Sequence, residues 1–225
     1  RLDCPPMTEL NSDTLRITEI FHSLQGEAKT AGKPTVFVRL TGCPLRCQYC
    51  DTEYAFAGGD LHSLDGILRA VKRYQCALVT VTGGEPLAQP NCLPLMRLLC
   101  DEGFDVSLET SGALSVAEVD PRVCIVLDLK TPGSGESHRN DWDNLSILSR
   151  KDQIKFVICD DQDYVWAKAK MLEGNLIERV GEILFSPSFG QQDPKQLAQW
   201  ILDDRLAVRM QLQLHKLLWE SEPGR

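Results

Sequence analysis

The sequence predicts an α/β fold in which most strands are parallel, either an open sheet or a barrel. Two observations predict it: short apolar runs alternate with stretches of helical spacing, and the chemically unusual residues follow directly after the runs. Regular alternation requires crossover connections, which join parallel strands. Parallel strands end at one common edge, so these unusual residues are expected to converge on a single mouth.

Short runs rich in Val, Ile, Leu and Phe are predicted as strands because they have the length and composition of buried strands. They cover residues 35–40, 77–81, 104–109, 123–129, 153–159, 182–187 and 209–215. An earlier run, residues 15–21, is expected to add an edge strand or a hairpin before the first strand–helix unit.

Stretches with helical spacing lie between several of these runs, at residues 63–74, 91–103, 161–174 and 193–204. Their ends carry the residues that start and stop helices. Ser63 is expected as an N-cap, and Asp193 with Pro194 as a helix start. Gly103 and Gly174 are expected as C-terminal stops.

The chain of 225 residues is expected to form one domain, since no linker-like stretch divides it. Residues 1–14 are expected to be a flexible leader, and residues 15–225 a single domain. The polar segment at residues 131–144 contains many turn formers and charges, which predicts a surface or active-site loop.

Charge and hydropathy narrow the function classes. The formal net charge is -8 and the pI is about 5.1, so the chain offers no general footprint for nucleic acid. Apolar runs are too short to span a bilayer, and the first residues lack the apolar centre of a secretory signal, so a cytoplasmic protein without membrane contact is expected.

Nine cysteines in such a chain argue against a disulfide framework, because the cytosol keeps thiols reduced and the number is odd. Those that are scattered receive no ligand role: Cys4, Cys76, Cys92, Cys100, Cys124 and Cys159. The remaining Cys43, Cys47 and Cys50 lie within a dozen positions behind an apolar run.

Three cysteines at gaps of four and three residues fit two kinds of metal site. A structural zinc ion needs a fourth ligand, which only a histidine remote in the sequence could supply. An iron–sulfur cubane held by three thiolates instead leaves one iron open to an exogenous ligand, which makes the site reactive.

Residues 43–50, C-P-L-R-C-Q-Y-C, match the C-x3-C-x-aromatic-C motif of the radical S-adenosylmethionine (SAM) superfamily, and "TGGEP" at residues 82–86 resembles its glycine-rich SAM segment. The resemblance implies a partial (β/α) barrel of the radical SAM type. It also implies that Cys43, Cys47 and Cys50 ligate a [4Fe–4S] cluster whose open iron takes SAM.

A narrower resemblance is to the 7-carboxy-7-deazaguanine synthase family of queuosine and deazapurine biosynthesis. It rests on "SLQGE", on "RLTGCPLRCQYCDT", on "VTGGEPLAQ" with "LETSG", and on the final "LQLHKLLW". It spans about residues 15 to 219, nearly the whole chain.

The family resemblance implies roles for the residues that match its motifs. Thr52 corresponds to a ligand of Mg²⁺. Expected SAM contacts are Tyr49, Gly84, Glu85, Glu109, Asp128, Leu129, Lys130 and Ser186, with Pro187 and Ser188 as further candidates. Expected substrate contacts are Leu24, Gln25, Gly26, Glu27, Arg39, Thr82 and His215, with Lys216 as a neighbour.

Two further expectations concern strand ends, and the chain also departs from the family pattern at two places. Arg39 is expected to hold the substrate carboxylate through a bidentate pair, as a guanidinium at a strand end can do. His215 and Lys216 are expected to end the last strand and to point towards the same mouth. The chain departs from some family members in keeping the short C-x3-C loop and in continuing past Trp219.

The resemblance implies a carbon–nitrogen lyase. The reduced cluster cleaves SAM to a 5′-deoxyadenosyl radical, which takes hydrogen from C6 of 6-carboxy-5,6,7,8-tetrahydropterin. The ring contracts with loss of ammonia to 7-carboxy-7-deazaguanine, and SAM is regenerated. Mg²⁺, an electron donor such as flavodoxin and a homodimer are also implied. Two alternatives stay open: a glycyl-radical-enzyme activase of the same superfamily, and a non-catalytic zinc-binding protein.

Overall fold

The computed structural model describes residues 13–220, 222 and 224. Over these residues the strands form one nine-stranded sheet in the order β3-β1-β2-β4-β5-β6-β7-β8-β9. Their bounds are β1 Thr14–Leu24, β2 Pro34–Leu40, β3 Asp60–Ser63, β4 Leu78–Gly83, β5 Asp105–Thr110, β6 Cys124–Asp128, β7 Gln153–Ile158, β8 Glu182–Pro187 and β9 Arg209–Met210.

From β2 to β9, neighbouring strands of this sheet are parallel. Strand β1 pairs antiparallel with β2 on one side and with β3 on the other, so the expected N-terminal edge hairpin is present, with a third strand that the sequence pattern missed. The two edges, β3 and β9, are not joined. The predicted α/β fold is confirmed as an open, partial barrel.

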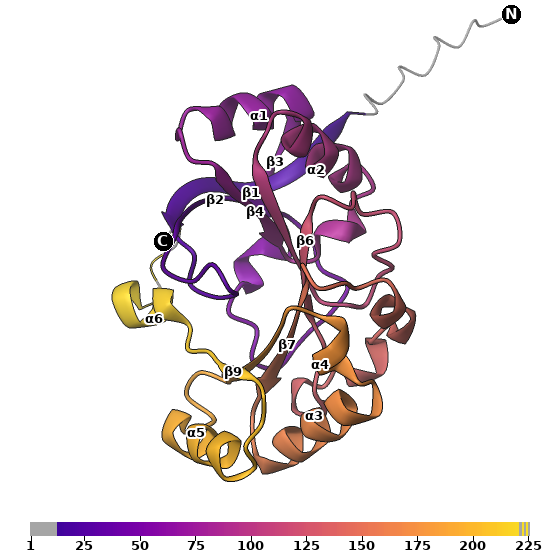
Figure 1. Ribbon diagram of the computed structural model, residues 1–225. Helices are drawn as coiled ribbons and strands as arrows, with labels where there is room; N and C mark the ends of the chain where they lie inside the picture. The colour runs from indigo at the N-terminus through magenta and orange to yellow at the C-terminus, as the bar shows by residue number, and fades with distance from the viewer. Residues whose placement is uncertain (1–12, 221, 223, 225) are drawn as a thin grey trace, which may run out of the picture.

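The helices are α1 Leu64–Lys72, α2 Cys92–Asp101, α3 Asp161–Glu173, α4 Leu176–Arg179, α5 Pro194–Asp203 and α6 Leu214–Trp219. In Figure 1, α1 and α2 lie beside the strands at the N-terminal end of the sheet, and α3, α4 and α5 beside those at the other. Two predicted starts are confirmed, because Ser63 accepts from Gly66 N and Asp193 from Lys195 N.

Two apolar clusters hold these helices against the sheet. One joins β1, β2, β4 and β5 to α1 and α2 and includes Val38, Leu95 and Leu108. The other joins β6, β7 and β8 to α3 and α5 and includes Phe156 and Leu197. Side chains buried in this way supply most of the stabilisation of such a fold, so the opposite face is left to carry polar residues.

The last predicted strand was too long. Strand β9 ends at Met210, and residues 214–219 are the short helix α6. After β9, Gln211 N donates to Phe185 O of β8 at 3.0 Å, and its side chain exchanges hydrogen bonds of 3.0 and 3.1 Å with the Ala28 backbone in the β1–β2 loop. Leu214 N then donates to Gly26 O at 3.0 Å.

The 131–144 segment contains three 3₁₀ helices at Pro132–Ser134, Ser137–Arg139 and Trp142–Ser146. It is packed rather than loose: the Asn140 side chain bonds both the N–H and the carbonyl of Lys130 at 2.9 Å. Gln48, in the cysteine loop, donates to Gly133 O at 2.7 Å, so the segment borders that loop.

The leader expected at residues 1–14 falls mostly outside the described residues. Within the described part, Thr14 already pairs with Ser63 in the sheet. Among the described residues, no helix is long and apolar enough to cross a membrane.

Candidate active site

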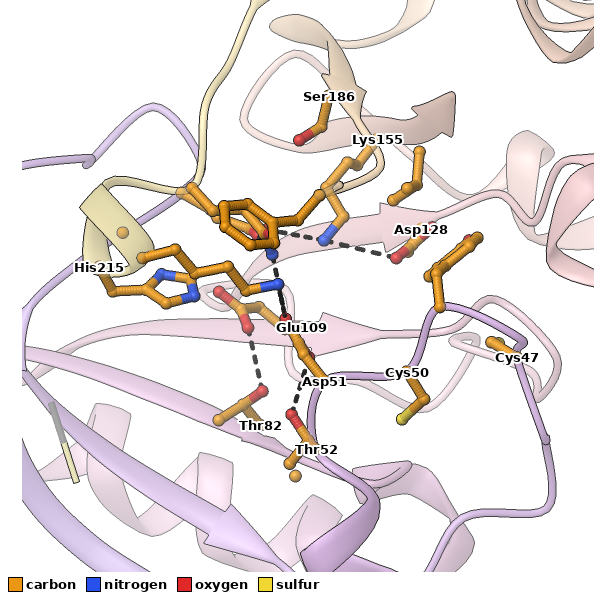
Figure 2. A pocket seen from close by; sticks show the side chains of 18 of the residues that line it. Cys47, Cys50, Asp51, Thr52, Thr82, Glu109, Asp128, Lys155, Ser186 and His215 are labelled. Carbon is orange, nitrogen blue, oxygen red and sulfur yellow. Dashed lines mark hydrogen bonds and ion pairs between the residues drawn. The ribbon is translucent and has the colours of Figure 1, made fainter. Parts of the chain in front are cut away.

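A cavity of about 590 Å³ opens at the carboxyl ends of the parallel strands. Residues that follow β2, β4, β5, β6 and β8 all contribute to its lining, as the strand-end pattern predicted. Figure 2 shows side chains from the cysteine loop, from several strands and from the C-terminal segment facing this space. The cysteines therefore share one cavity with most of the other predicted site residues.

Cys43, Cys47 and Cys50 line the cavity with half-buried side chains. Gly42, with φ of +100°, gives the loop a turn that a side chain would strain. Burial raises the pKa of all three thiols, that of Cys47 to about 11, so without a metal they stay protonated. A bound metal would displace those protons.

Among the described residues no three His, Cys, Asp or Glu side chains converge on a point where they could hold one metal ion. The three thiols nevertheless line the same cavity. A cubane has irons at separate corners, so its ligands surround a volume and need not meet at a point. Three thiolate donors on one loop are therefore a donor set that fits a cluster with one open iron.

The TGGEP segment is pressed against the cysteine loop. A Cβ on Gly83 would lie 2.2 Å from Leu40 O, and one on Gly84 would lie 2.2 Å from Gly42 O. Backbone bonds from Gly84 N to Leu40 O (3.2 Å) and from Glu85 N to Gly42 O (2.8 Å) close the contact. The glycines are needed for this approach, which brings the Gly84 backbone to the cavity wall.

Two residues predicted to contact SAM, Glu85 and Leu129, do not line the cavity. Glu85 does not line the cavity: its fully buried carboxylate accepts from Leu87 N, from Thr110 Oγ1 and from both N and Oγ of Ser111. Through these hydrogen bonds, Glu85 links the TGGEP segment to the LETSG segment on the side away from the cavity. The Leu129 side chain packs into the apolar core, because consecutive residues of a strand point to opposite faces.

Asp128 and Lys130 line the cavity beside the cysteines and form an ion pair of 2.9 Å. Asp128 Oδ1 and the Tyr49 hydroxyl are buried and have no hydrogen-bond partner among the described residues. Buried polar atoms without protein partners are rare, and a bound ligand or water is one way to satisfy them. This side of the cavity therefore fits a ligand with hydroxyl or amine donors, such as SAM.

Lys155 of β7 is a site residue that the sequence interpretation missed. Its Nζ lies 2.7 Å from Glu27 Oε2 and 3.4 Å from Asp128 Oδ2. Burial alone would raise the pKa of Glu27 and lower that of Lys155, but their mutual attraction outweighs it and keeps both groups charged. A lysine inside the apolar run "QIKFVIC" was the available signal.

Glu109 lies deep in the cavity between Gln25 and Thr82. Gln25 Nε2 donates to its Oε1 at 3.2 Å, and Thr82 Oγ1 donates to its Oε2 at 3.0 Å. Burial, together with the nearby Glu27 carboxylate, raises the pKa of Glu109. The protonated carboxyl is favoured relative to an exposed glutamate, so Glu109 can donate as well as accept hydrogen bonds.

Arg39 lines the cavity and is already held by a neighbour. Its Nε lies 2.7 Å from Glu19 Oε1, which also accepts from the Tyr54 hydroxyl at 2.8 Å. The guanidinium carbon lies 5.6 Å from the centre of the Phe21 ring and 5.8 Å from that of Tyr54. These contacts fix the orientation of the guanidinium, and the carboxylate that it binds in this structure is that of Glu19.

Thr52 lines the cavity next to Asp51, a carboxylate that the sequence interpretation missed. Its hydroxyl donates to Asp51 Oδ1 at 3.0 Å, and Lys216 Nζ lies 3.0 Å from Asp51 Oδ2. Gln213 Nε2 donates to Asp51 Oδ2 at 3.1 Å and to Glu27 Oε1 at 2.7 Å. The C-terminal segment thereby connects the cysteine loop to the β1–β2 loop.

His215 faces the cavity from α6, not from the end of a strand as expected. It packs on Gly26 so closely that a Cβ there would lie 2.1 Å from His215 Nδ1. Burial lowers the pKa of His215, which favours the neutral imidazole. Figure 2 shows this ring on the same side of the cavity as Glu109 and Thr82.

Other predicted residues also line the cavity: Leu24 at the end of β1, and Ser186, Pro187 and Ser188 at the end of β8. The described residues that follow Trp219 do so too, namely Glu220, Glu222 and Gly224. The segment after Trp219 thus borders the site.

Comparison with known proteins agrees with this geometry. The model of the radical SAM superfamily matches residues 37–124. The 7-carboxy-7-deazaguanine synthase of Chlorobaculum tepidum is 44% identical over 211 residues, covering 92% of this chain and 96% of the relative. The chain belongs to the 7-carboxy-7-deazaguanine synthase family. The synthase of Koribacter versatilis is 42% identical, covering 92% and 98% of the two chains.

Solved structures agree on the fold. The crystal structure of QueE from Escherichia coli superposes with a TM-score of 0.73 at 24% identity, covering 90% of this chain and 95% of that one. Streptococcus suis SuiB bound to its precursor peptide SuiA superposes with a TM-score of 0.55 at 13% identity, covering 76% and 46%.

Family membership makes this protein a lyase of the radical SAM superfamily and implies a [4Fe–4S] cluster and SAM. It decides against both alternatives raised by the sequence, the glycyl-radical-enzyme activase and the non-catalytic zinc protein.

Proposed function

We propose that this protein converts 6-carboxy-5,6,7,8-tetrahydropterin to 7-carboxy-7-deazaguanine with loss of ammonia, using a [4Fe–4S] cluster, SAM and Mg²⁺. One observation carries the proposal. The three thiols share a single cavity with two sets of polar residues, Asp128 and Lys130 on one side and Gln25, Glu27 and Glu109 on the other. A cofactor and a polar heterocycle can therefore meet in one cavity.

When bound, the cluster and SAM would supply one-electron chemistry that generates a carbon radical able to take hydrogen from the substrate. Cys43, Cys47 and Cys50 would hold the cluster. Asp128 would accept a hydrogen bond from SAM at its unpartnered Oδ1, and the exposed backbone of Gly84 would lie against its methionine end.

The substrate side is suited to a pterin because donors and acceptors alternate along it. Gln25, Glu27 and Glu109 lie within hydrogen-bond reach of one another or of shared partners, and Thr82 adds a hydroxyl. A heterocycle that carries both N–H and C=O groups needs such a mixed set. Arg39, held by Glu19, would face the substrate carboxylate with the edge of its guanidinium that Glu19 does not use.

The proposed Mg²⁺ site is formed around Thr52 and Asp51. The Thr52 hydroxyl and Asp51 Oδ1 are 3.0 Å apart, and both are hard oxygen donors of the kind that Mg²⁺ prefers. Lys216 partly neutralises Asp51, so the substrate carboxylate would have to complete the site. The chemistry of this donor set fits Mg²⁺ bound by Thr52 together with the substrate.

The test is an anaerobic reaction of cluster-loaded protein with reductant, SAM, Mg²⁺ and 6-carboxytetrahydropterin. Mass spectrometry is expected to detect 7-carboxy-7-deazaguanine with the parent and none with Cys47→Ala. Cleavage of SAM without this product would keep the superfamily assignment and refute the substrate. No SAM cleavage by protein verified to contain iron and sulfide would refute the proposed reaction.

The family resemblance also supports an external electron donor such as flavodoxin, a homodimer and a reducing, cytoplasmic compartment. The electron donor and the homodimer each have a direct measurement. Reduced flavodoxin should replace a chemical reductant in the assay, and sedimentation should give twice the mass of one chain.

A further inference from the structure

Lys155 lies between two carboxylates that belong to different sides of the cavity. Glu27 Oε2 is 2.7 Å away on the side proposed for the pterin, and Asp128 Oδ2 is 3.4 Å away on the side proposed for SAM. Figure 2 shows the Lys155 ammonium group and the Asp128 carboxylate joined across this part of the cavity. A single ammonium group thus connects the two proposed ligand sites.

The three side chains are shielded from water, with exposed fractions of 15% for Lys155, 12% for Glu27 and 15% for Asp128. Charge interactions are stronger in such surroundings than at the surface, so the position of one group affects the others. Lys155 Nζ lies closer to Glu27 Oε2, at 2.7 Å, than to Asp128 Oδ2, at 3.4 Å.

Each carboxylate has a second partner from a different part of the chain. Asp128 Oδ2 also bonds Lys130, and Glu27 Oε1 accepts from Gln213. Asp128 Oδ1 is left buried and unpartnered. A ligand that donates to Asp128 Oδ1 would order Asp128, and through Lys155 it would also order Glu27.

We infer that Lys155 is a positioning residue that couples the two ligand sites, so that SAM bound beside Asp128 raises the affinity for the carboxypterin beside Glu27. The inference rests on the proposed function. A ligand that changes the hydrogen bonds or charge at one carboxylate changes its attraction for Lys155, and Lys155 carries that change to the other carboxylate. Because coupling between binding equilibria is reciprocal, the pterin raises the affinity for SAM by the same factor.

The test is equilibrium binding, not turnover. Isothermal titration calorimetry on anaerobic, cluster-loaded protein without reductant gives the dissociation constant of 6-carboxytetrahydropterin with and without saturating SAM, and that of SAM with and without the pterin. We expect each ligand to tighten the other about tenfold in the parent. In Lys155→Met the factor should fall below about twofold while SAM still binds, and Lys155→Arg should recover most of it, since a guanidinium can span two carboxylates.

Lys168→Met is the matched control. Lys168 also pairs with a carboxylate, Asp204 at 2.6 Å, but neither residue lines the cavity. Its coupling factor should equal that of the parent. If Lys155→Met fails to fold, Glu27→Gln removes the charge on one side of the bridge and keeps the lysine. It should abolish coupling and leave the affinity for SAM alone within about twofold of the parent.

Two results would overturn the inference: a parent that binds both ligands without coupling, or a Lys155→Met or Glu27→Gln variant with the coupling of the parent. A parent that binds SAM but no carboxypterin under any condition would refute the proposed substrate instead, and with it the premise of the inference.

Discussion

Replacing Glu85 by alanine tests the finding that this carboxylate ties the TGGEP and LETSG segments together. The substitution leaves buried donors on three residues without their acceptor: Leu87 N at 3.0 Å, Thr110 Oγ1 at 2.9 Å, and N (2.7 Å) and Oγ (2.5 Å) of Ser111. Hydrogen bonds to a charged group contribute about 1.5–3 kcal/mol each, and the loss is reduced because alanine removes a buried charge.

We expect Glu85→Ala to lower the free energy of unfolding by about 3–5 kcal/mol, a large share of the total for a domain. Urea unfolding of cluster-free protein, followed by circular dichroism, should show the midpoint falling by more than about 1 M. Glu85→Gln keeps one carbonyl acceptor and should lose about half as much. The exposed Glu118 gives a control, with Glu118→Ala changing stability by less than about 0.5 kcal/mol. A decrease in the free energy of unfolding of less than about 1 kcal/mol for Glu85→Ala would refute the role of Glu85 in holding the two segments together.

Three further predictions concern the cavity. Gly26→Ala forces a Cβ to within 2.1 Å of His215 Nδ1, so limited proteolysis should cleave near α6 faster than in the parent, whereas unchanged cleavage would contradict the close packing. Thr52→Ala should keep the parent's iron content but lose the stimulation of product formation by Mg²⁺; equal stimulation would remove Thr52 from the metal site. Burial lowers the pKa of His215 below that in the unfolded chain, so its contribution to stability is present above pH 6.5 and lost as pH falls through the folded-state pKa. The midpoint temperature of thermal unfolding should therefore fall less steeply for His215→Gln than for the parent as the pH is lowered from 8 to 5. Midpoints that fall in parallel for the two proteins would contradict this.

The sequence was sufficient for the parallel sheet and its strand-end site because both follow from local patterns. Apolar runs such as 35–40 have a strong strand signal, and parallel strands must end at one edge. The three cysteines and the TGGEP segment were placed in the same way, since each directly follows a strand.

What the sequence did not give depends on contacts between distant segments. The segment that follows β9 is held by contacts such as that of the Gln211 side chain with Ala28, 183 residues away, and no local pattern contains that contact. Lys155 and Asp51 were missed because their partners, Glu27 and Lys216, come from other loops. Glu85 was assigned to the cofactor because its motif borders the cavity, whereas its side chain turns the other way towards Thr110 and Ser111.

The measurement that tests the central claim most directly follows one hydrogen atom. Anaerobic turnover with 6-carboxytetrahydropterin deuterated at C6 should move deuterium into SAM, in parallel with formation of 7-carboxy-7-deazaguanine, and Cys47→Ala should show neither. That result would establish that both ligands react in the cavity lined by the three cysteines. Product that forms without deuterium reaching SAM would contradict the account.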